Sequence, residues 1–406
     1  MPAEASLKVN WEGSLFVHHS LGMVNRELLR AFAGDRRFDI RHIPYEPDRF
    51  SIDAAPEFEC LRPSLAGAHA GADVLVRHRW PPDFTPPRHG LLVLFQPWEY
   101  GALPIEWVEK IPRFADEVWV YSEYLRECYR ASGIDENIVR VIPLGVDPAA
   151  FHAEAAPSAW MRRAAGDRYC FFFNGGATFR KGIDILVNAY AAEFGPAERV
   201  CLIIKGSRAY SGGLGQKIGE LAQRTGGAPI IYFTDDLSPR ELPGLYTACD
   251  CYVHPYRSEG YGLPIAEAMA CGRPVIVTGA GAARDFTDTT NAYLIKCSLE
   301  KLPVRAAGGL PTVASPFWIL PDMDDLRRLM RYVFDNREEA ALRGIRASRT
   351  IREQHTWSRS ALFAKERLIA LAADAGNHCP AGVFSGDHDR RCGIEDVARQ
   401  SPGLAH

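Results

Sequence analysis

The sequence predicts an α/β protein with two doubly wound, Rossmann-like domains. Short apolar runs bounded by turn residues alternate with helical patterns, which is typical of parallel sheets covered by helices. This alternation fills the first half of the chain and is repeated in the second half. The 406 residues are enough for two to three domains, and 47% hydrophobic residues can fill ordinary cores. We therefore expect two domains, with ligands at the carboxyl ends of the strands.

In the first half, apolar runs predict strands that alternate with helices. The predicted strands cover residues 7–11, 72–76, 91–95, 117–121 and 139–143. One helix is predicted over residues 21–33, and another runs from Ser122 to Arg130. Ser122 marks the start of that helix because its hydroxyl can accept a hydrogen bond from an N–H near Leu125. The Leu-Gly-Val-Asp sequence at 144–147 follows the last strand and is the expected hinge.

The second half repeats the pattern. Strands are predicted over residues 170–173, 200–204, 230–233, 251–254 and 274–278. Helices are predicted to begin near Gly182, Gly213, Pro239 and Pro264. Most of the polar motifs described below follow these strands, at the edge where a doubly wound sheet binds its ligands.

The periodicity is lost between residues 298 and 321, where glycines and prolines interrupt it. This predicts a loop longer than a compact domain usually needs, either as an ordered excursion or as a decoration of the fold. Helices are predicted over 324–336 and 338–372. The residues after 373 are polar, Gly-rich and aperiodic, so we expect a flexible tail. A zinc site in that tail is the disfavoured alternative; its ligands would be His378, Cys379, His388 and Cys392.

Charge and cysteine usage restrict the function and the location. A net charge of −3 argues against a nucleic-acid-binding protein. Ten cysteines without a C-x-x-C pair indicate neither a zinc ribbon nor a disulfide scaffold, and we expect a cytoplasmic protein. No apolar run is long enough to span a membrane, and no secretion signal is recognised. Four arginines around the first predicted helix could form a weak basic face that contacts the inner side of a membrane. A solvated helix face is the favoured explanation for them; they are Arg26, Arg30, Arg36 and Arg37.

Glu259 and Glu267 lie in the most informative segment, Ser-Glu-Gly-Tyr-Gly-Leu-Pro-Ile-Ala-Glu-Ala-Met-Ala at 258–270. Glu259 precedes a Gly-X-Gly turn, Pro264 suits the first helical position, and Glu267 then lies one turn into a helix. The N-terminus of a helix can bind a diphosphate, and glycines let the backbone approach it. If the two glutamates stood alone, no functional role would be needed to explain them. Glu259 would be a solvated loop charge, and Glu267 would complement the helix dipole.

The surrounding segment 256–278 resembles the signature of glycosyltransferase family 4; it reads Tyr-Arg-Ser-Glu-Gly-Tyr-Gly-Leu-Pro-Ile-Ala-Glu-Ala-Met-Ala-Cys-Gly-Arg-Pro-Val-Ile-Val-Thr. The resemblance implies the GT-B fold, in which two Rossmann-like domains face each other and the second binds the sugar donor. It divides the chain into an acceptor-side domain (1–146), a nucleotide-sugar domain (147–336), crossover helices (337–373) and a tail (374–406). The resemblance also implies that Glu267 binds the ribose of the donor. The other residues that it places on the donor are Gly260, Tyr261, Gly262 and Leu263.

A second part of the donor site is predicted after the strand at 170–173. Arg180 and Lys181 come just ahead of a helix, where two cations are unfavourable unless an anion is bound. The resemblance assigns them to the leaving diphosphate, with Gly176 in the preceding glycine loop. Many family members carry an Arg directly after the glycine, and this shorter loop does not, so Lys181 is the firmer assignment.

The base of the donor is predicted to lie after the strand at 230–233. By resemblance, the backbone of Thr234 pairs with the base edge and Leu237 packs on its face. Asp235 and Asp236 could be mistaken for a metal-binding D-x-D motif. Such sites belong to the other major glycosyltransferase architecture, so we expect helix capping there and no metal.

Polar residues also follow strands of the first half, so we expect them to face the cleft. Gly13 and Ser14 are placed where family members bring a glycine loop close to the donor phosphate. His78 and Glu99 are candidate acid/base or acceptor-orienting groups. The predicted apolar platforms for a sugar ring are Trp80 and Trp98.

The implied function is retaining transfer of a hexose from a nucleoside-diphosphate sugar to an acceptor hydroxyl in glycan or glycoconjugate synthesis. Lys181 and Arg180 would stabilise the leaving group while Glu259 holds the donor sugar, and no cofactor or metal is expected. The acceptor can be a glycan, a lipid-linked glycan or another hydroxyl compound. A GT-B epimerase, a sugar phosphorylase and a non-catalytic sugar-nucleotide-binding protein are the alternatives. The last is motivated by Gln96, which stands where family enzymes often carry a His.

Overall fold

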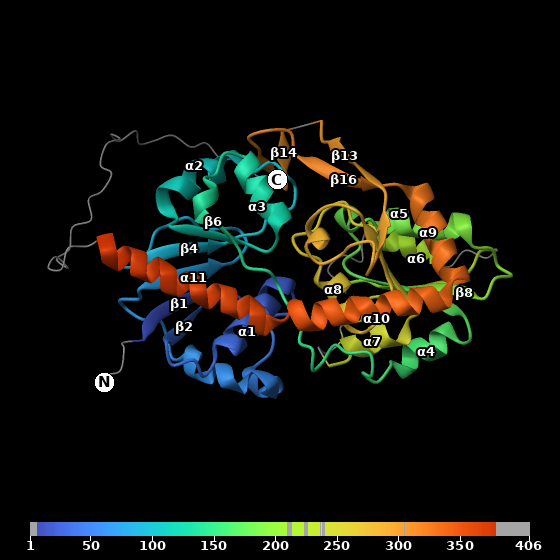
Figure 1. Ribbon diagram of the computed structural model, residues 1–406, viewed down its shortest axis with the longest axis horizontal. Coiled ribbons are helices and arrows are strands. Elements are labelled where there is room, and N and C mark those ends of the chain that lie inside the picture. The colour runs from blue at the N-terminus through green and yellow to red at the C-terminus, as the bar shows by residue number, and fades with distance from the viewer. Residues whose placement is uncertain are drawn as a thin grey trace.

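The computed structural model describes residues 6–208, 213–222, 226–235, 237, 240–303 and 305–378. Two six-stranded parallel sheets, each covered by helices, form two lobes that lie side by side (Figure 1). Two of the predictions fall on residues outside these ranges: the helix start at Pro239 and most of the tail with its zinc alternative. The described helices include none with the length and apolar character that a membrane crossing requires.

The first lobe contains a sheet in the order β2-β1-β3-β4-β5-β6. Its strands are β1 (Leu7–Gly13), β2 (Phe38–Pro44), β3 (Val74–His78), β4 (Leu91–Phe95), β5 (Glu117–Val120) and β6 (Val139–Val141). Its main helices are α1 (Ser20–Phe32), α2 (Ile105–Phe114) and α3 (Glu123–Ala131). The core rings of Trp11, Phe95 and Trp119 make edge contacts at 5.7 and 6.4 Å.

Among these strands and α-helices, β2 and α2 were not predicted. β2 is an edge strand whose residues are mostly half-buried, so its apolar residues do not form a continuous run. α2 contains Pro112 in its last turn, which makes its sequence untypical of a helix interior. The predicted cap of α3 is confirmed, because Ser122 Oγ accepts a hydrogen bond from Leu125 N at 3.3 Å.

The second lobe contains a sheet in the order β12-β11-β10-β7-β8-β9. Its strands are β7 (Tyr169–Asn174), β8 (Val200–Lys205), β9 (Ile230–Phe233), β10 (Cys251–His254), β11 (Val275–Thr278) and β12 (Tyr293–Ile295). Its helices are α4 (Ala159–Ala165), α5 (Ile183–Glu193), α6 (Leu214–Ala222), α7 (Leu242–Ala248) and α8 (Leu263–Ala270). β7 to β11 are the predicted strands, whereas the short elements α4 and β12 were missed.

Residues 297–321, called the excursion from here on, are ordered as two antiparallel strand pairs. β13 (Cys297–Lys301) pairs with β16 (Phe317–Pro321), and β14 (Ala306–Ala307) pairs with β15 (Leu310–Pro311). Gly308 and Gly309 connect the second pair with φ of +57° and +80°, as a tight hairpin turn requires. The glycines that interrupt the sequence periodicity therefore form the turn of a hairpin.

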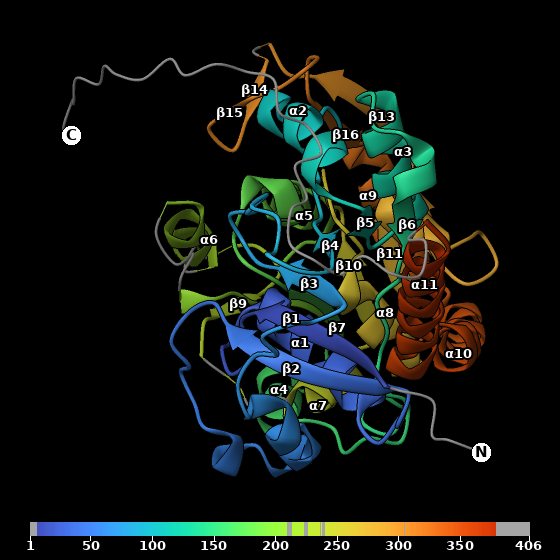
Figure 2. The ribbon, with the colours of Figure 1, turned by 90° about the vertical axis from the view of Figure 1, so that its left-hand side faces the viewer.

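The excursion starts in the second lobe and reaches the first. Val313 N donates to Leu103 O at 3.0 Å and Phe317 N donates to Tyr100 O at 3.2 Å. In Figures 1 and 2 its strands lie at the top of the molecule, and β14 and β15 lie near α2. The lobes are thus connected there by hydrogen bonds between segments far apart in the sequence.

The C-terminal helices are α9 (Met323–Asp335), α10 (Arg337–Gln354) and α11 (Trp357–His378). The helical region predicted over 338–372 is divided into α10 and α11, because the chain leaves helical geometry at His355, with φ of −123° and ψ of 63°. His355 O accepts a hydrogen bond from Val146 N at 2.9 Å in the segment that links the lobes. α10 then lies along the second lobe and α11 crosses to the first, where Lys365 Nζ donates to Ala31 O at 2.9 Å (Figure 1).

Candidate functional site

The turn before α8 has the predicted glycine geometry. Gly262 is the N-cap residue of α8 with φ of +100°, and Pro264 follows as the second helical residue. The Gly260 carbonyl accepts a hydrogen bond from Ser122 Oγ at 3.0 Å, so the first lobe contacts this turn directly. Tyr261 is buried and its hydroxyl lies 3.2 Å from His355 Nδ1, next to the segment that links the lobes. The turn therefore lies where the two lobes meet.

Glu259 is buried among cations. Lys181 Nζ forms an ion pair with Glu259 Oε1, and Arg180 Nη1 lies 3.8 Å from Oε2. His254, fully buried at the end of β10, has its Nε2 3.0 Å from Glu259 Oε1. Burial alone would raise the pKa of Glu259, but Lys181, His254 and Arg180 hold it well below its ordinary range. Glu259 is thus an ionised carboxylate fixed in one orientation.

The groups around Glu259 have their own pKa shifts. Burial lowers the pKa of Lys181, although the Glu259 carboxylate opposes this. Burial also lowers the pKa of His254, so the imidazole is neutral at pH 7. A neutral His254 donates from Nε2 to Glu259 and accepts at Nδ1 from the Tyr252 hydroxyl at 2.8 Å. His254 therefore helps to fix the orientation of the Glu259 carboxylate.

Arg180 connects the two lobes. Its Nη1 donates to Glu99 Oε1 at 3.1 Å and to Ser258 O at 3.2 Å. Ser258 Oγ in turn donates to the Glu99 carbonyl. Arg180 and Lys181 lie in the short 3-10 turn Phe179–Lys181 ahead of α5, so both predicted cations approach Glu259 from the same segment. Glu99, a predicted acid/base candidate, is here the partner of a donor-site cation.

Glu267 is buried in α8, and the Tyr246 hydroxyl of α7 donates to its Oε2 at 2.7 Å. Burial raises the pKa of Glu267 to about 7, and this hydrogen bond opposes the shift. Asn174 Nδ2 donates to Tyr246 at 3.0 Å, and Tyr252 lies 3.1 Å from the Asn174 carbonyl. Since Tyr252 also contacts His254, a continuous series of polar groups connects Glu267 with Glu259.

The predicted base loop lies at the end of β9. Thr234 and Leu237 are half-buried, and Leu237 lines a cavity of about 480 Å³ together with Trp160 and Phe233. Asp235 is exposed and forms an ion pair with Arg208 at 3.4 Å, while Asp236 lies outside the described residues. Gly176 O accepts a hydrogen bond from Thr178 N at 2.8 Å within the loop that leads to Arg180.

In the first lobe, Gly13 and Ser14 end β1 as predicted. A Cβ atom on Gly13 would lie 2.5 Å from Asn25 Nδ2 and from the His78 carbonyl, so only glycine fits this approach. Ser14 Oγ donates to the Glu46 carboxylate, which also lies 2.7 Å from His19 Nε2. Gly13 thus brings β1 close to α1 and β3.

His78 does not face the cleft, and the prediction that it does is wrong. Its side chain is fully buried, with Nδ1 2.6 Å from Asn25 Oδ1 and Nε2 2.5 Å from the Tyr121 hydroxyl. Burial lowers the pKa of His78 to about 3, so the ring is neutral. Tyr121 lies beside Gly260, so His78 is linked through Tyr121 to the turn before α8.

One of the two predicted ring platforms is also wrong. Trp98 is 1% exposed, and its Nε1 donates to Ala102 O at 2.8 Å in the interior. Trp80 is 44% exposed and stacks on Trp98 with the ring centroids 6.3 Å apart. Trp80 is therefore the surface ring, and Trp98 supports it.

Sequence reasoning missed His254, Tyr246, Ser122 and Ser258 as parts of this site. His254 carried a usable signal, because it ends a predicted strand five residues before Glu259. Ser122 was recognised only as a helix cap, since its second contact depends on how the lobes pack. Tyr246 lies in the middle of a short apolar helix, and no local pattern distinguishes it from a core residue.

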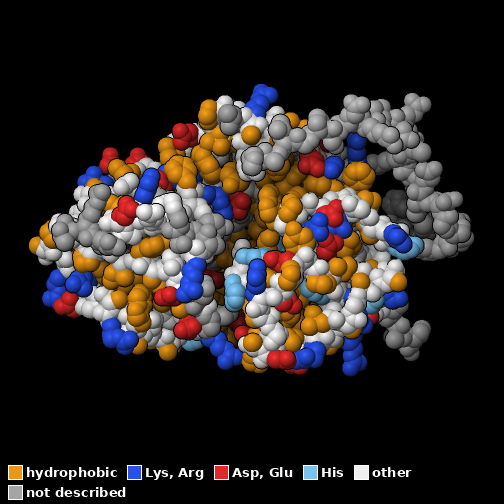
Figure 3. Space-filling model, turned by 180° about the vertical axis from the view of Figure 1, so that it is seen from behind, with side chains coloured by type: hydrophobic (Ala, Val, Ile, Leu, Met, Phe, Trp, Pro, Cys, Tyr) orange, Lys and Arg blue, Asp and Glu red, His pale blue; other side chains and the backbone are white. Residues whose placement is uncertain are grey.

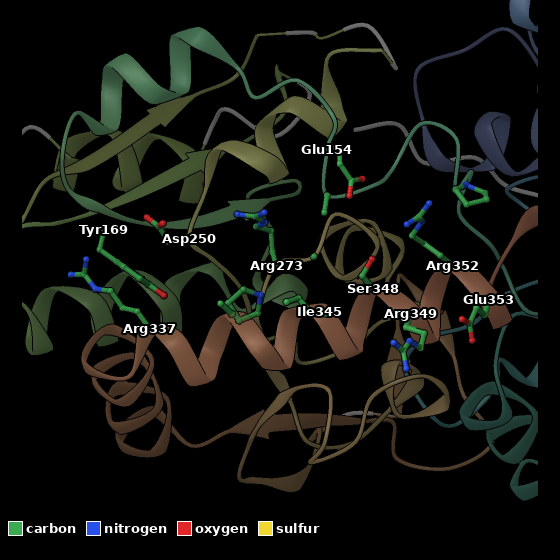
Figure 4. Close-up of a pocket in the computed structure, with 15 residues that line it drawn as sticks. Glu154, Tyr169, Asp250, Arg273, Arg337, Ile345, Ser348, Arg349, Arg352 and Glu353 are labelled. Atoms are coloured by element: carbon green, nitrogen blue, oxygen red, sulfur yellow. The ribbon is translucent and has the colours of Figure 1, made fainter.

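A cavity of about 900 Å³ lies elsewhere, between α10, the segment after the hinge, and the amino ends of strands of the second lobe. Its lining includes Arg273, Arg337, Arg349 and Arg352. Figure 4 shows these side chains spread along α10 and its neighbours, not directed at one point. Asp250, Glu154 and Glu353 are interspersed among them. This cavity lacks the convergent charge that the Glu259 site has.

The site as a whole brings two cations, an ionised carboxylate and a helix N-terminus to one boundary between the lobes. A diphosphate fits the cations and the N–H groups of the helix, because both stabilise negative charge. A polyhydroxyl compound fits Glu259 and Glu267, which accept hydrogen bonds from hydroxyl groups.

Comparisons with known proteins agree with this geometry. Residues 168–302 match the family model of glycosyl transferases group 1. A D-inositol 3-phosphate glycosyltransferase of Acidothermus cellulolyticus is 29% identical over 213 residues, which cover 50% of this chain and 46% of the relative. A GDP-mannose-dependent alpha-(1-6)-phosphatidylinositol monomannoside mannosyltransferase of Mycobacterium tuberculosis is 28% identical over 189 residues, covering 44% and 48%. The matches thus span somewhat less than half the length of these curated relatives.

Solved structures are similar over most of the chain. Anabaena Alr3699/HepE in complex with UDP and glucose has a TM-score of 0.62 at 15% identity, covering 90% of this chain and 100% of that one. Sucrose-phosphate synthase from Thermosynechococcus elongatus has a TM-score of 0.61 at 16% identity, with the same coverage. At this identity the likeness concerns the fold, and it confirms the predicted GT-B class.

Proposed function

We propose that this GT-B chain is a group 1 glycosyl transferase, as the match of residues 168–302 to that family model suggests, and that it transfers a sugar from a nucleoside-diphosphate donor to an acceptor hydroxyl. The observation that carries the proposal is the convergence of Lys181 and Arg180 on Glu259 beside the N-terminus of α8. Two half-buried cations at a helix start favour anionic ligands, and a diphosphate leaving group would be a further anion beside the Glu259 and Glu99 carboxylates that they contact here.

The proposed reaction begins with departure of the nucleoside diphosphate. Lys181 and Arg180 neutralise its developing charge, assisted by the N–H groups at the start of α8. To do so, both cations turn part of their contacts from Glu259 and Glu99 to the phosphates. Glu259, kept ionised by Lys181 and by the hydrogen bond from His254, then holds hydroxyls of the donor sugar and faces the positive charge that grows at the anomeric carbon.

We propose that the anomeric configuration is retained through attack on the face that the leaving group departs from. Glu259 is already held by Lys181 and His254, which suits it to orienting the sugar and not to forming a covalent bond with it. The acceptor hydroxyl enters from the first lobe and passes its proton to the leaving phosphate. Product stereochemistry by proton NMR tests this; an inverted anomer would contradict it.

The donor base is tested by ligand-induced stabilisation. The relatives and neighbours are named with GDP-mannose or crystallised with UDP, so UDP-, GDP- and ADP-sugars are the donors to compare. A ligand at a hundred times its dissociation constant should stabilise the protein by about 2.7 kcal/mol. The stabilising nucleotide sugar is then tested for hydrolysis and transfer. A protein stabilised by none of the three would contradict the proposed function, and binding without any turnover would indicate a sugar-nucleotide-binding protein.

We also propose that transfer needs no divalent metal, because Lys181 and Arg180 occupy the place where a metal would neutralise the diphosphate. With the metal-stripped protein, EDTA should leave the transfer rate within about twofold. The control is the same assay with added magnesium or manganese. Loss of transfer in EDTA, restored by either ion, would contradict the mechanism.

A further inference from the structure

A row of aromatic rings from both lobes crosses the molecule beside the donor site. The ring of Trp80 stacks on Trp98 at 6.3 Å, and Trp98 contacts Tyr100 at 5.1 Å. Tyr100 contacts Trp318 of the excursion at 5.2 Å, and Trp318 contacts Phe179 at 6.0 Å. We call these five residues the aromatic row.

The two ends of the aromatic row are exposed to solvent, and two of the rings between them are partly accessible. Trp80 and Phe179, at its two ends, are 44% and 52% exposed, while Tyr100 and Trp318 are half-buried. Only Trp98 lies in the interior, behind the others. Exposed aromatic rings that continue into a proposed ligand site can stack on the apolar face of a ligand. In Figure 3, hydrophobic side chains gather on the face seen from behind, between the two lobes.

The row is continuous with the proposed site. Phe179 belongs to the same 3-10 turn as Arg180 and Lys181. Tyr100 directly follows Glu99, whose carboxylate holds Arg180 at 3.1 Å. A molecule lying on the row therefore passes next to the cations that hold the donor diphosphate.

The rings are held in place by contacts on their protein side. The Arg257 guanidinium lies 3.5 Å from the Phe179 ring centroid and is fixed by two hydrogen bonds to Asp184, both at 2.7 Å. The backbone on either side of Trp318 is bonded to both lobes, through Phe317 N to Tyr100 O and Ile319 N to Arg257 O. A surface held this way loses little conformational freedom on binding.

We propose that the aromatic row binds the acceptor, and that this acceptor is a glycan chain of several sugar units. This rests on the proposed function. A sugar ring has an apolar face that stacks on an aromatic ring and a rim of hydroxyl groups that needs polar partners. The row offers both, because three half-buried charged residues adjoin its rings in the sequence: Arg79 precedes Trp80, Glu99 precedes Tyr100 and Arg180 follows Phe179. A lipid chain would require a groove without such charges.

The test compares sugars of increasing length. Neutral oligosaccharides of one to four units, in gluco- and manno-configured series, are titrated onto the full chain with saturating donor nucleotide. Affinity should rise by about threefold to tenfold as each successive unit reaches an exposed ring. W318A should weaken binding of the trisaccharide by a similar factor, and W80A, at the far end, should affect the longest sugars.

The matched control is L299A. Leu299 is 67% exposed on β13, which pairs with the strand of Trp318, but it lies outside the aromatic row. This variant should bind every sugar as the parent protein does. Equal affinity for one unit and for four in both series, or equal losses in L299A and W318A, would overturn the inference. If the donor nucleotide still binds in that case, only the glycan inference is lost. If the nucleotide itself fails to bind, the proposed function is lost as well.

Discussion

At the residue scale, the Lys181–Glu259 pair differs from an exposed lysine–glutamate pair because Glu259 is buried and Lys181 is half-buried beside the expected leaving group. Lys181→Ala should lower turnover at saturating donor by about a hundredfold to a thousandfold, as loss of one preorganised charge does at other active sites. The matched control is Lys110→Ala, which breaks the exposed pair with Glu106. Steady-state kinetics on both variants is the measurement, and similar turnover in the two would contradict the role of Lys181.

Glu267 gives a prediction about pH. Its pKa of about 7 in the folded protein lies above the ordinary value of 4.5, so the folded state binds the proton more tightly. This contribution to stability is complete below pH 4.5 and is lost as the pH rises to 7, for a total of about 3 kcal/mol. Glu267→Gln lacks the titrating group. Its free energy of unfolding relative to the parent protein should therefore rise between pH 5 and pH 8.

The same residue should make nucleotide binding depend on pH. Ribose hydroxyls donate hydrogen bonds best to the ionised carboxylate, so nucleotide affinity should increase as the pH rises through 7. Calorimetry on the parent protein and on Glu267→Gln measures both effects. A parent protein whose stability relative to the variant is constant from pH 5 to pH 8 would show that Glu267 titrates normally.

At the element scale, the 3-10 turn that carries both cations depends on Gly182. Its φ is +68°, and a Cβ atom there would lie 1.8 Å from the Pro255 carbonyl, directly after β10. Gly182→Ala should therefore cost about 3 kcal/mol of stability and move Lys181 away from Glu259. Gly133→Ala is the control, because Gly133 has φ of +96° but open space around it. It should cost about 1 kcal/mol and leave transfer unchanged. Thermal unfolding and kinetics on the pair are the measurements; equal losses would contradict the steric argument.

The elements also show what local patterns can predict. Long apolar strands such as β4 and β8, and capped helices such as α3, were predictable because their signals lie within a few residues. The excursion was not, since its strands are short and are stabilised by a lobe distant in sequence. The same limit applies to the site: Glu259 and Lys181 follow from motifs, whereas the burial of His78 and the contact of Ser122 with Gly260 depend on packing.

At the scale of the whole molecule, Ser122 couples stability to the contact between lobes. Ser122 and Ser158 cap α3 and α4 in the same way, each accepting a backbone N–H at 3.3 Å. Ser122 additionally donates to the Gly260 carbonyl across the boundary. Replacing either by Ala should cost about 1 kcal/mol, but only Ser122→Ala should lower kcat/KM for transfer, by about threefold to tenfold. Unfolding and kinetics on both variants separate the two effects. Matching kinetic losses would mean that the interlobe hydrogen bond is unimportant.

The contacts of the excursion with the first lobe affect the design of chimeras that join the N-terminal half of one such protein to the C-terminal half of another. The excursion is continuous with the half of the chain that carries Lys181 and Glu259, yet it forms hydrogen bonds with Tyr100 and Leu103 of the other half. A chimera joined at the hinge near Val146 would therefore place residues 97–104 of one protein against the excursion of the other. Exchange of the C-terminal half alone should transfer part of the acceptor preference with it. Grafting of the N-terminal half should succeed best when residues 97–104 are kept with the excursion that evolved beside them.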